Sequence, residues 1–574
     1  MTIGLSRVAG KAGLLGLAAM LPTTAVHAQV PSPGQVVPPT LQPAPDRPAE
    51  RPAVTAPAPA PIDLPANAAA LNVTLGSVRV EGGLPGLTAE TNALTTPFAG
   101  RRVPVADVYM LARQIEAAYA RHGYVLARVT VPPQQLRDGA DVRLVVVDGF
   151  VEAIDASALP ASVRAPVARR AGRLVGRRGL RIAEIERALL LAGETAGVTL
   201  SSTITPGKQD GGATLVLNGA HAPVSGSLAF DNRLGGEYGR RELVAQLSLN
   251  GVLGLGERIY GTLIFNPDDA PFGSGNPRSI AGGGIVLPVG GAGWQVNLEY
   301  VAARTNPILG GAAPAIGGRY DRAALSVAYP AIRNRRERLD FGFGVDAITE
   351  SSEAKAFGTL LSRDRLRTAH VDASWRRALP GGATMGASGQ LSVGIDGLGA
   401  RSLADATASG VPLSRQGARP DFVKLSGGGD VRVPVGATWS LTGTLRYQAS
   451  FSGALPGSQQ FTQGTTDAVS TLPTGALPGD TGVTLRGELA ERFDLGRLTL
   501  APYVFAAGGI SHLAQPTAVE RRDTKAGAAG VGARVFAGPL LARTSLYAGA
   551  EYGGAFVAGR PDSDRFTIEI GLRF

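Results

Sequence analysis

The sequence predicts a transmembrane β-barrel of about sixteen antiparallel strands, preceded by two small α+β modules. Apolar and polar side chains alternate from Gly226 to Phe574, and no helical pattern in this stretch could cover a sheet. The last strand alternates along Phe566, Thr567, Ile568, Glu569, Ile570, Gly571, Leu572, Arg573 and Phe574. Lipid on one side and a polar lumen on the other explain this pattern. The strands of a soluble all-β protein also alternate between apolar and polar side chains, but such a protein would have to bury the apolar side chains in a core and expose the polar ones to water.

The connections between the expected strands support the barrel. Those after even-numbered strands are short, whereas most after odd-numbered strands are long, such as Asp396–Pro420 and Phe451–Thr481. Outer-membrane barrels have short periplasmic turns and long extracellular loops, so we expect the N-terminal modules in the periplasm. The strands are expected near 226–233, 240–250, 257–266, 278–288, 293–303, 321–330, 336–347, 366–378, 382–395, 421–434, 438–450, 482–492, 497–510, 525–537, 541–553 and 565–574.

The N-terminus has the pattern of a secretory signal peptide, residues 1–28. Arg7 and Lys11 precede the apolar run Ala12–Leu21, and Val26–Ala28 offers a cleavage site with small residues. The run is too short for a membrane helix. Residues 29–65 are rich in proline and alanine, which predicts a disordered or semi-rigid linker.

Two related modules follow, at residues 71–149 and 150–220. Each is expected to have the order strand, helix, helix, strand, strand, and one offset pairs Gly123 with Gly197 and Pro132 with Pro206. The expected elements of the first are Val73–Glu81, Thr88–Thr95, Val105–His122, Tyr124–Val131 and Val142–Val147. Those of the second are Val151–Asp155, Ser162–Leu174, Ile182–Ala192, Val198–Thr205 and Ala213–Leu217. The barrel then occupies residues 226–574.

Composition argues against an enzyme, a metal site and a cofactor. The chain has no cysteine, and its five histidines are scattered without ligand spacing. No nucleophile elbow or phosphate loop is recognisable in the sequence. The formal charge is +10, but no stacking aromatics accompany the basic run Arg333–Arg338, so we expect no nucleic-acid binding. In a periplasmic turn, this run is expected to contact phosphate headgroups.

The order of these elements, with short motifs inside them, resembles one family. In the first module the motifs are Ile115–Tyr124, Pro132–Gln134 and Asp148–Gly149; in the second they are Ala188–Leu191, Gly197–Val198 and Thr205–Gly207; at the start of the barrel they are Phe230–Asn232 and Gly254–Glu257. They resemble the haemolysin secretion/activation family (ShlB/FhaC/HecB-like), the two-partner secretion transporters of the BamA-like superfamily. In that family the modules are POTRA domains.

The resemblance places the family's signature sixth extracellular loop at Phe451–Thr481. Gly479 and Asp480 resemble the segment that follows its tip. The family's tip usually reads Val-Arg-Gly-Tyr, whereas the corresponding residues here are Val469, Ser470, Thr471 and Leu472. The arginine is therefore missing.

The family's tip arginine pairs with an aspartate of strand thirteen, in a Phe-x-Asp-x-Gly pattern. That pattern here is Phe505, Ala507 and Gly509, so the aspartate is missing as well. Losing one member of a buried ion pair costs about 3–5 kcal/mol, whereas losing both can be near neutral. If the loop lies inside the lumen, hydrogen bonds and packing must hold it there.

The resemblance implies an outer-membrane transporter that captures an unfolded, secreted partner polypeptide in the periplasm and moves it to the cell surface without nucleotide hydrolysis. Capture would add a partner strand to a module edge. The candidate edge residues are Tyr124, Leu126 and Arg128 in the first module and Val198 and Leu200 in the second. The inward side chains among them are expected to serve the module cores.

Two further partners are expected: outer-membrane lipids, and the barrel-assembly machinery, which would recognise the C-terminal strand ending at Phe574. The alternative functions are a factor that inserts other barrels and a diffusion porin. The assembly branch of the superfamily usually carries more POTRA domains than two, and a porin needs none.

Overall fold

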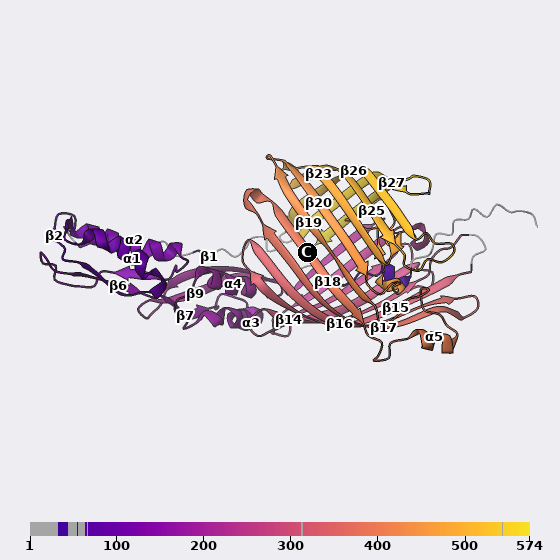
Figure 1. Cartoon of the computed structure of the whole chain (residues 1–574), viewed down its shortest axis with the longest axis horizontal. Helices are drawn as coiled ribbons and strands as arrows, with labels where there is room; N and C mark the ends of the chain where they lie inside the picture. Colours follow the sequence, from indigo (N-terminus) through magenta and orange to yellow (C-terminus); the bar gives the residue numbers. More distant parts are fainter. Residues whose placement is uncertain (1–31, 44–53, 56–63, 66, 311–313, 542–543) are drawn as a thin grey trace, which may run out of the picture. The chain divides into compact units, whose positions relative to one another are not determined.

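The predicted closed barrel is confirmed. The structure, a computed structural model, describes residues 32–43, 54–55, 64–65, 67–310, 314–541 and 544–574, so the expected signal peptide lies outside the described residues. Strands β10–β20 and β23–β28 form one closed antiparallel sheet (Figure 1). Because β23 and β24 both pair with β25, they make one wall strand, and the described part of the chain contains sixteen strand positions.

The wall strands follow one another in sequence order around the barrel. They are β10 (Val224–Asp231), β11 (Glu242–Asn250), β12 (Arg258–Phe265), β13 (Arg278–Val289), β14 (Trp294–Thr305), β15 (Ile316–Arg333), β16 (Glu337–Ala354), β17 (Thr359–Ala378), β18 (Thr384–Gly394), β19 (Val423–Val435), β20 (Trp439–Ser450), β23 (Thr481–Glu491), β24 (Phe493–Leu495), β25 (Leu498–His512), β26 (Asp523–Leu541), β27 (Thr544–Val557) and β28 (Ser563–Arg573). The barrel closes where β10 pairs with β28 through five residue pairs, from Ser227–Arg573 to Asp231–Glu569.

The two faces of the wall differ as the alternation predicted. Outward side chains such as Trp294, Phe341 and Leu441 are exposed, whereas inward charged side chains such as Glu299 and Arg486 are buried. This is the division expected between lipid and lumen.

Strands β15, β16 and β17 are longer than predicted, at 18, 18 and 20 residues. We expected a loop at Arg304–Tyr320, but β15 begins inside this range, at Ile316, so the loop is shorter than predicted. Residues 355–358 alone connect β16 to β17. The added portions, such as Ser351–Glu353 and Ser362–Arg365, are polar on both faces. The alternation of apolar and polar side chains could not predict these added portions, because it identifies a strand only where one face is apolar.

The first module differs from its prediction in two strands. The expected strand Val73–Glu81 is divided into β2 (Asn72–Thr74), which pairs with β4 (Arg102–Pro104), and β3 (Val78–Gly82). The expected strand Tyr124–Val131 contains only β5 (Arg128–Thr130), at the end of the sheet β3-β6-β5, in which β6 is Val142–Val147. The helices are α1 (Thr88–Thr95) and α2 (Val105–Arg121), with the 3₁₀ helices η2 (Pro85–Leu87) and η3 (Thr96–Phe98).

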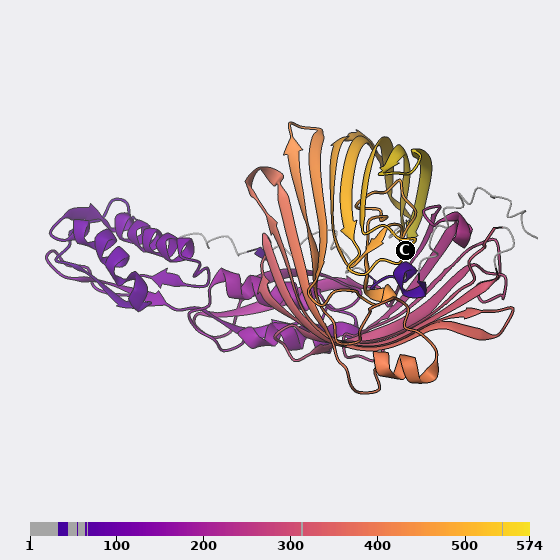
Figure 2. The ribbon, with the colours of Figure 1, turned by 45° about the vertical axis from the view of Figure 1, so that its right-hand side comes forward.

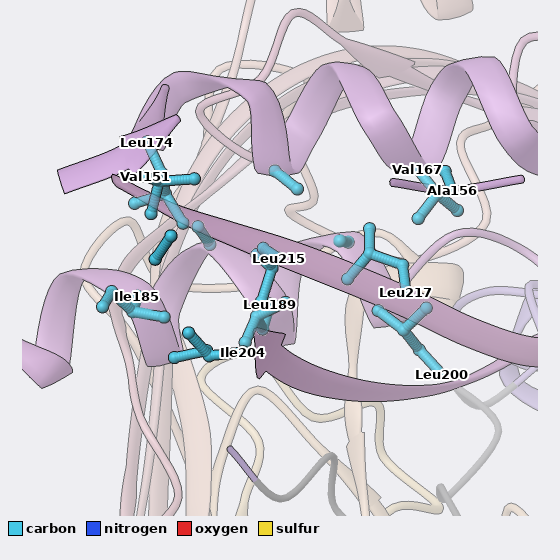
Figure 3. Packing of buried hydrophobic residues seen from close by; sticks show 14 of the residues in the cluster. Val151, Ala156, Val167, Leu174, Ile185, Leu189, Leu200, Ile204, Leu215 and Leu217 are labelled. Carbon is cyan, nitrogen blue, oxygen red and sulfur yellow. The ribbon is translucent and has the colours of Figure 1, made fainter. Parts of the chain in front are cut away.

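The second module has the predicted element order and a compact apolar core. Its elements are β7 (Phe150–Asp155), α3 (Ala161–Ala171), η4 (Gly172–Leu174), α4 (Ile182–Gly193), β8 (Val198–Pro206) and β9 (Gly212–His221). Figure 3 shows Ile185 and Leu189 of α4 packed near Leu215 of β9. In the described part of the chain, no helix is long and apolar enough to cross a membrane.

Residues 32–43 form part of the lumen filling, which corrects the prediction that the whole of 29–65 is a linker. This N-terminal segment contains η1 (Pro33–Val36) and lies inside the barrel (Figure 2, indigo). Val37 and Leu41 pack in one apolar cluster with wall residues such as Tyr260 and Val301. Proline-rich composition predicted an extended chain, but it carried no information about the surface on which that chain packs.

The remaining part of the proline-rich stretch that the structure describes contains β1 (Val54–Thr55). It pairs in parallel with β8, so the second module's sheet has the order β1-β8-β9-β7. The loops contain α5 (Leu403–Ser409), η5 (Gly236–Tyr238), η6 (Pro380–Gly382), η7 (Gly457–Gln459) and the short pair β21 (Phe461–Thr462) and β22 (Pro478–Gly479).

Candidate functional site

Loop six, defined here as residues 451–480 between β20 and β23, folds into the lumen. Its tip is buried: Val469 is 0% exposed, Ser470 3% and Thr471 4%. Val469 and Leu472 pack with Tyr503 and Phe505 of β25 in one apolar cluster. Apolar packing therefore contributes to holding the tip against the wall.

Ser470 anchors the tip to a pair of charges on the wall. Its hydroxyl donates to a Glu551 carboxylate oxygen and accepts from Arg486 Nη1 at 2.6 Å. Arg486 Nη2 lies 2.7 Å from Glu551 Oε2, and the Tyr503 hydroxyl donates to the same oxygen at 2.9 Å. The Arg486 guanidinium also lies over the Phe505 ring, 4.0 Å from its centroid. The loop thus contributes a neutral hydroxyl to a buried ion pair whose two members are both wall residues.

Strand pairing relates this arrangement to the missing family residues. Arg486 of β23 lies directly opposite Ala507 of β25, the position where the family's pattern has aspartate. An arginine is therefore present beside that position, but it comes from the wall rather than from the loop tip. Sequence reasoning missed Glu551 as its partner, because 65 residues separate the two in the chain and no local motif joins them.

A second ion pair continues this cluster. Arg534 Nη2 donates to Glu488 Oε2 at 2.7 Å, and the Arg534 guanidinium lies 4.0 Å from the centroid of the Tyr503 ring. Glu488 is buried and Arg534 is partly exposed, so this pair extends the charged cluster from the buried wall toward the open lumen.

The base of loop six is pinned by Asp480, which is 1% exposed. Its carboxylate accepts from the backbone N–H of Leu455 at 2.9 Å and of Ala514 at 2.9 Å, and from Gln460 Nε2 at 3.2 Å. A Cβ on Gly479 would lie 2.7 Å from the Ser511 side chain, and one on Gly509 would lie 2.6 Å from Thr484. Glycine at both positions therefore permits the loop and the strands to approach closely.

The N-terminal segment touches loop six as well as the wall. Gln35 Nε2 donates to Gln460 Oε1 at 2.8 Å, and a Cβ on Gly34 would lie 2.3 Å from the Ser458 Cβ. The two fillings of the lumen therefore share a contact between η1 and η7.

The candidate capture residues of the first module do not form one surface. Tyr124 precedes β5 and accepts a hydrogen bond from Arg181 Nε at 3.2 Å. Arg128 lies on β5 and is 3.3 Å from Glu116. Leu126 is 7% exposed and belongs to the apolar core of the second module, so its side chain does not line an accessible edge.

In the second module, Leu200 is buried in the core (Figure 3) and Val198 packs against it. Their strand β8 has one edge on β9 and the other on β1, where Val54 is level with Ser202 and Thr55 with Thr203. The edge that we expected to be open is thus occupied by two residues of the same chain.

The basic run Arg333–Arg338 contacts the second module, and this corrects the expectation that its environment is phosphate headgroups. Arg333 Nη2 lies 2.5 Å from Glu194 Oε1, and Arg335 Nε lies 3.1 Å from Glu186 Oε1. Arg187 donates to the Ala331 carbonyl at 3.1 Å. These two ion pairs and the hydrogen bond from Arg187 join the module to the turn between β15 and β16.

The last residue of the chain takes part in closing the barrel. Phe574 exchanges backbone hydrogen bonds with Gly226, at 3.0 and 3.1 Å, and its side chain is exposed at the seam.

Among the described residues, no group of three or more histidine, aspartate and glutamate side chains could hold a metal ion.

Replacing one member of the Arg486–Glu551 ion pair should release the loop tip, whereas replacing both members should not. With Ala468→Cys as a probe in this cysteine-free chain, Arg486→Met should increase labelling by a membrane-impermeant maleimide, because Glu551 loses its counter-charge and the tip its anchor. Arg486→Met with Glu551→Leu should restore slow labelling in large part, since no buried charge remains. Asp494→Asn, which alters an exposed ion pair, is the control. Equal labelling of the single and the double variant would contradict this account.

The missing family pair can be tested by rebuilding it. Ser470→Arg should lower the temperature at which the folded barrel loses its SDS resistance, because a second guanidinium enters the buried site beside Arg486. Adding Ala507→Asp should recover the loss, since that position faces Arg486 across the strands. Ala507→Asp alone serves as the matched control, and failure of the double variant to recover would count against pairing between these positions.

Comparisons with known proteins agree with this architecture. The family model described as POTRA domain, ShlB-type, matches residues 73–149, and the model described as haemolysin secretion/activation protein ShlB/FhaC/HecB matches residues 211–535. The solved structure of CdiB from Escherichia coli covers 91% of this chain and 94% of its own, with a TM-score of 0.70 and 20% identity. CdiB from Acinetobacter baumannii covers 88% and 90%, with a TM-score of 0.57 and 12% identity. These likenesses show the fold.

Two curated relatives match part of the sequence. The outer membrane transporter CdiB of Escherichia coli is 24% identical over 222 residues, which is 38% of this chain and 36% of the relative. The heme/hemopexin transporter protein HuxB of Haemophilus influenzae (strain 86-028NP) is 25% identical over 175 residues, 30% and 31%. The match thus spans about a third of each relative. Because the second family model covers more than half of the chain, the chain belongs to the haemolysin secretion/activation family ShlB/FhaC/HecB, a family of outer-membrane β-barrel transporters whose POTRA domains lie in the periplasm.

Proposed function

We propose that this protein is a two-partner secretion transporter, which takes an unfolded partner polypeptide from the periplasm to the cell surface through the barrel without nucleotide hydrolysis. The observation that carries this function is the filling of the lumen. Two segments of the chain, residues 32–43 and loop six, occupy it, and both are held by hydrogen bonds and packing rather than by covalent links. Such fillings can leave and return, which a conduit for a large cargo requires.

Capture of the partner is the first step in this proposal. A polypeptide can add as a strand to an open sheet edge through backbone hydrogen bonds, which most sequences can form. Strand β5 ends the sheet of the first POTRA domain, and on the outer edge of β8, in the second module, the described residues place the two-residue strand β1. We infer that the partner uses the edge of β5 and replaces β1 on β8.

The remaining partners follow from the surface of the barrel. The exposed apolar side chains of the wall would contact outer-membrane lipids, and the C-terminal strand that ends at Phe574 would be read by the barrel-assembly machinery. The chemistry proposed for the lumen is binding and passage, with no catalytic step.

A second candidate is a factor that inserts other barrels. The observation that favours it is the short seam: β10 pairs with β28 over five residues, whereas it pairs with β11 over eight. Lateral opening at this seam would serve insertion. A diffusion porin is disfavoured by the two fillings, which obstruct the path of small solutes.

Deleting the gene separates these functions. Comparison of the culture-supernatant and outer-membrane proteomes, with a plasmid copy as the control, should show the loss of one or two large exported proteins while other barrels keep their levels. A joint fall of many barrel proteins would instead establish the assembly function and overturn transport.

The role of the β8 edge can be tested with a reversible lock. Adjacent strands are about 4.8 Å apart, which suits a disulfide, so Thr55→Cys with Thr203→Cys should fix β1 on β8. Export should fall under oxidising conditions and recover on reduction. Ser201→Cys with Asn218→Cys, a facing pair of β8 and β9, is the matched control because it leaves the outer edge unchanged. Normal export by the oxidised lock would exclude this edge as a capture site.

A further inference from the structure

Basic side chains gather on the outward face of the wall where β14, β15, β16 and β17 lie side by side (Figure 1). They are Arg304 of β14, Arg319 of β15, and Arg363, Arg365 and Arg367 of β17. Each is an even number of residues away from an exposed, lipid-facing side chain of its own strand, namely Tyr300, Leu325 or Val371, so it has the same outward direction. We call these five residues the arginine patch.

Strand pairing holds the guanidinium groups of the arginine patch near one another. Arg304 lies directly opposite Arg319. On the two sides of β16, Arg319 and Arg363 both pair with Ser351. Adjacent strands are about 4.8 Å apart, so the patch spans roughly 15 Å across the strands. Like charges at facing positions repel each other, and an anion bound between them would remove this repulsion.

The arginine patch has no ion-pair partner in the part of the chain that the structure describes. Two carboxylates share this face, those of Asp321 and Glu353, and Asp321 accepts a hydrogen bond from the Tyr300 hydroxyl at 2.9 Å. Near the loops elsewhere on the wall, charges are paired, as in Arg241 with Asp268 at 2.7 Å. Positive charge therefore prevails on the outward face of β14–β17.

The backbone that carries three of these arginines is held on both sides. Strand β16 pairs with one edge of β17 along the patch, but β18 does not reach this part of the other edge. Loop five, defined here as residues 395–422, takes its place. Ile395 N–H donates to the Arg367 carbonyl at 2.7 Å, and Arg401 N–H donates to the Arg365 carbonyl at 2.9 Å. The arginine patch therefore has a firm support.

The arginine patch begins where the apolar band of the outer wall ends. Toward the loops, the outward side chains of β17 are Trp375, Ala373, Val371 and Ala369, followed by Arg367, Arg365 and Arg363. Those of β14 are Trp294, Val296, Leu298, Tyr300 and Ala302, followed by Arg304. The second POTRA domain contacts Arg333, at the opposite end of β15 from Arg319. The patch thus lies at the end of the barrel away from the periplasm, at the level of the outer leaflet.

A lipid with an anionic head group matches both parts of this surface. A guanidinium donates two parallel hydrogen bonds to a phosphate group, and acyl chains pack against apolar side chains. The outer leaflet of the outer membrane contains glycolipids whose sugar head groups carry phosphates. A soluble anion would use the arginines alone, whereas such a glycolipid would also use the apolar band beside them.

We propose that the arginine patch binds the phosphate groups of an outer-leaflet glycolipid, whose acyl chains lie on the apolar band of β14–β17. This inference goes beyond the proposed function, because the site is on the outside of the wall and is the same whether the barrel exports a partner or inserts other barrels. The bound lipid neutralises the arginines and holds the long strands at a fixed depth in the membrane.

Binding can be measured on the purified full chain in detergent, with fluorescent lipopolysaccharide as the probe. Arg319→Gln with Arg363→Gln should raise the Kd at least about tenfold, because hydrogen bonds between charged groups are lost. Dephosphorylated lipopolysaccharide should bind the unaltered protein as weakly as the phosphorylated probe binds this double variant.

Arg377→Gln with Arg492→Gln is the matched control, because it removes the same charge from exposed positions at the periplasmic end of the wall. It should leave the Kd within about twofold. Equal losses in the two double variants, or equal binding of the two probes, would overturn the site. Displacement of the probe by an equal concentration of inorganic phosphate would overturn the assignment to a lipid. Unaltered SDS resistance verifies that both variants are folded.

Occupation of the site in cells can be tested with a photoreactive residue at one of two outward positions. Ala323 of β15 lies between the apolar band and the arginine patch, and Leu485 of β23 lies on another part of the wall. Position 323 should cross-link to lipopolysaccharide more strongly than position 485, and Arg319→Gln with Arg363→Gln should reduce it to the level of 485. Equal cross-linking at both positions in the otherwise unaltered protein would show only general lipid contact and overturn the proposal.

Discussion

A backbone that crosses lipid has to satisfy its own hydrogen bonds, and every other property of this protein depends on the closed sheet that achieves this. Closure between β10 and β28 leaves no strand edge in the membrane. Strand edges lie instead in the modules that precede the barrel, such as β5 at the end of the sheet β3-β6-β5. Closure also encloses a lumen lined by buried charges, and those charges require partners.

The lumen meets this requirement in two different ways. On β23, β25 and β27, charges are paired with one another, and loop six adds only the Ser470 hydroxyl to them. On β13–β16, Arg322 is paired with Glu299, and both also bind backbone atoms of the N-terminal segment. One side of the lumen is thus complete without its filling apart from a hydroxyl. On the other side, Arg322 and Glu299 keep each other as partners when the filling departs but lose their hydrogen bonds to its backbone.

The sequence was sufficient to predict the parts of the fold that follow from local patterns. Alternation and turn length located all sixteen wall positions, and helical periodicity located α2 and α4. The family resemblance located loop six, and the absence of its usual arginine was visible in the sequence. The pairing of Arg486 with Glu551 was not predictable, because it depends on which strands face each other across the lumen. The position of residues 32–43 was missed for the same reason, since their partners are hundreds of residues away.

The unequal lengths of the wall strands affect the surrounding bilayer. Strands β10, β11 and β12 have eight or nine residues, which corresponds to about 26–30 Å along each strand, and strand tilt reduces the height further. The hydrocarbon core of a typical bilayer is about 30 Å thick. Although the bacterial outer membrane is thinner than this average, strands β10–β12 offer less height to match it than β15–β17, which have 18–20 residues. We therefore expect the membrane to be thinner beside β10–β12 than beside β15–β17.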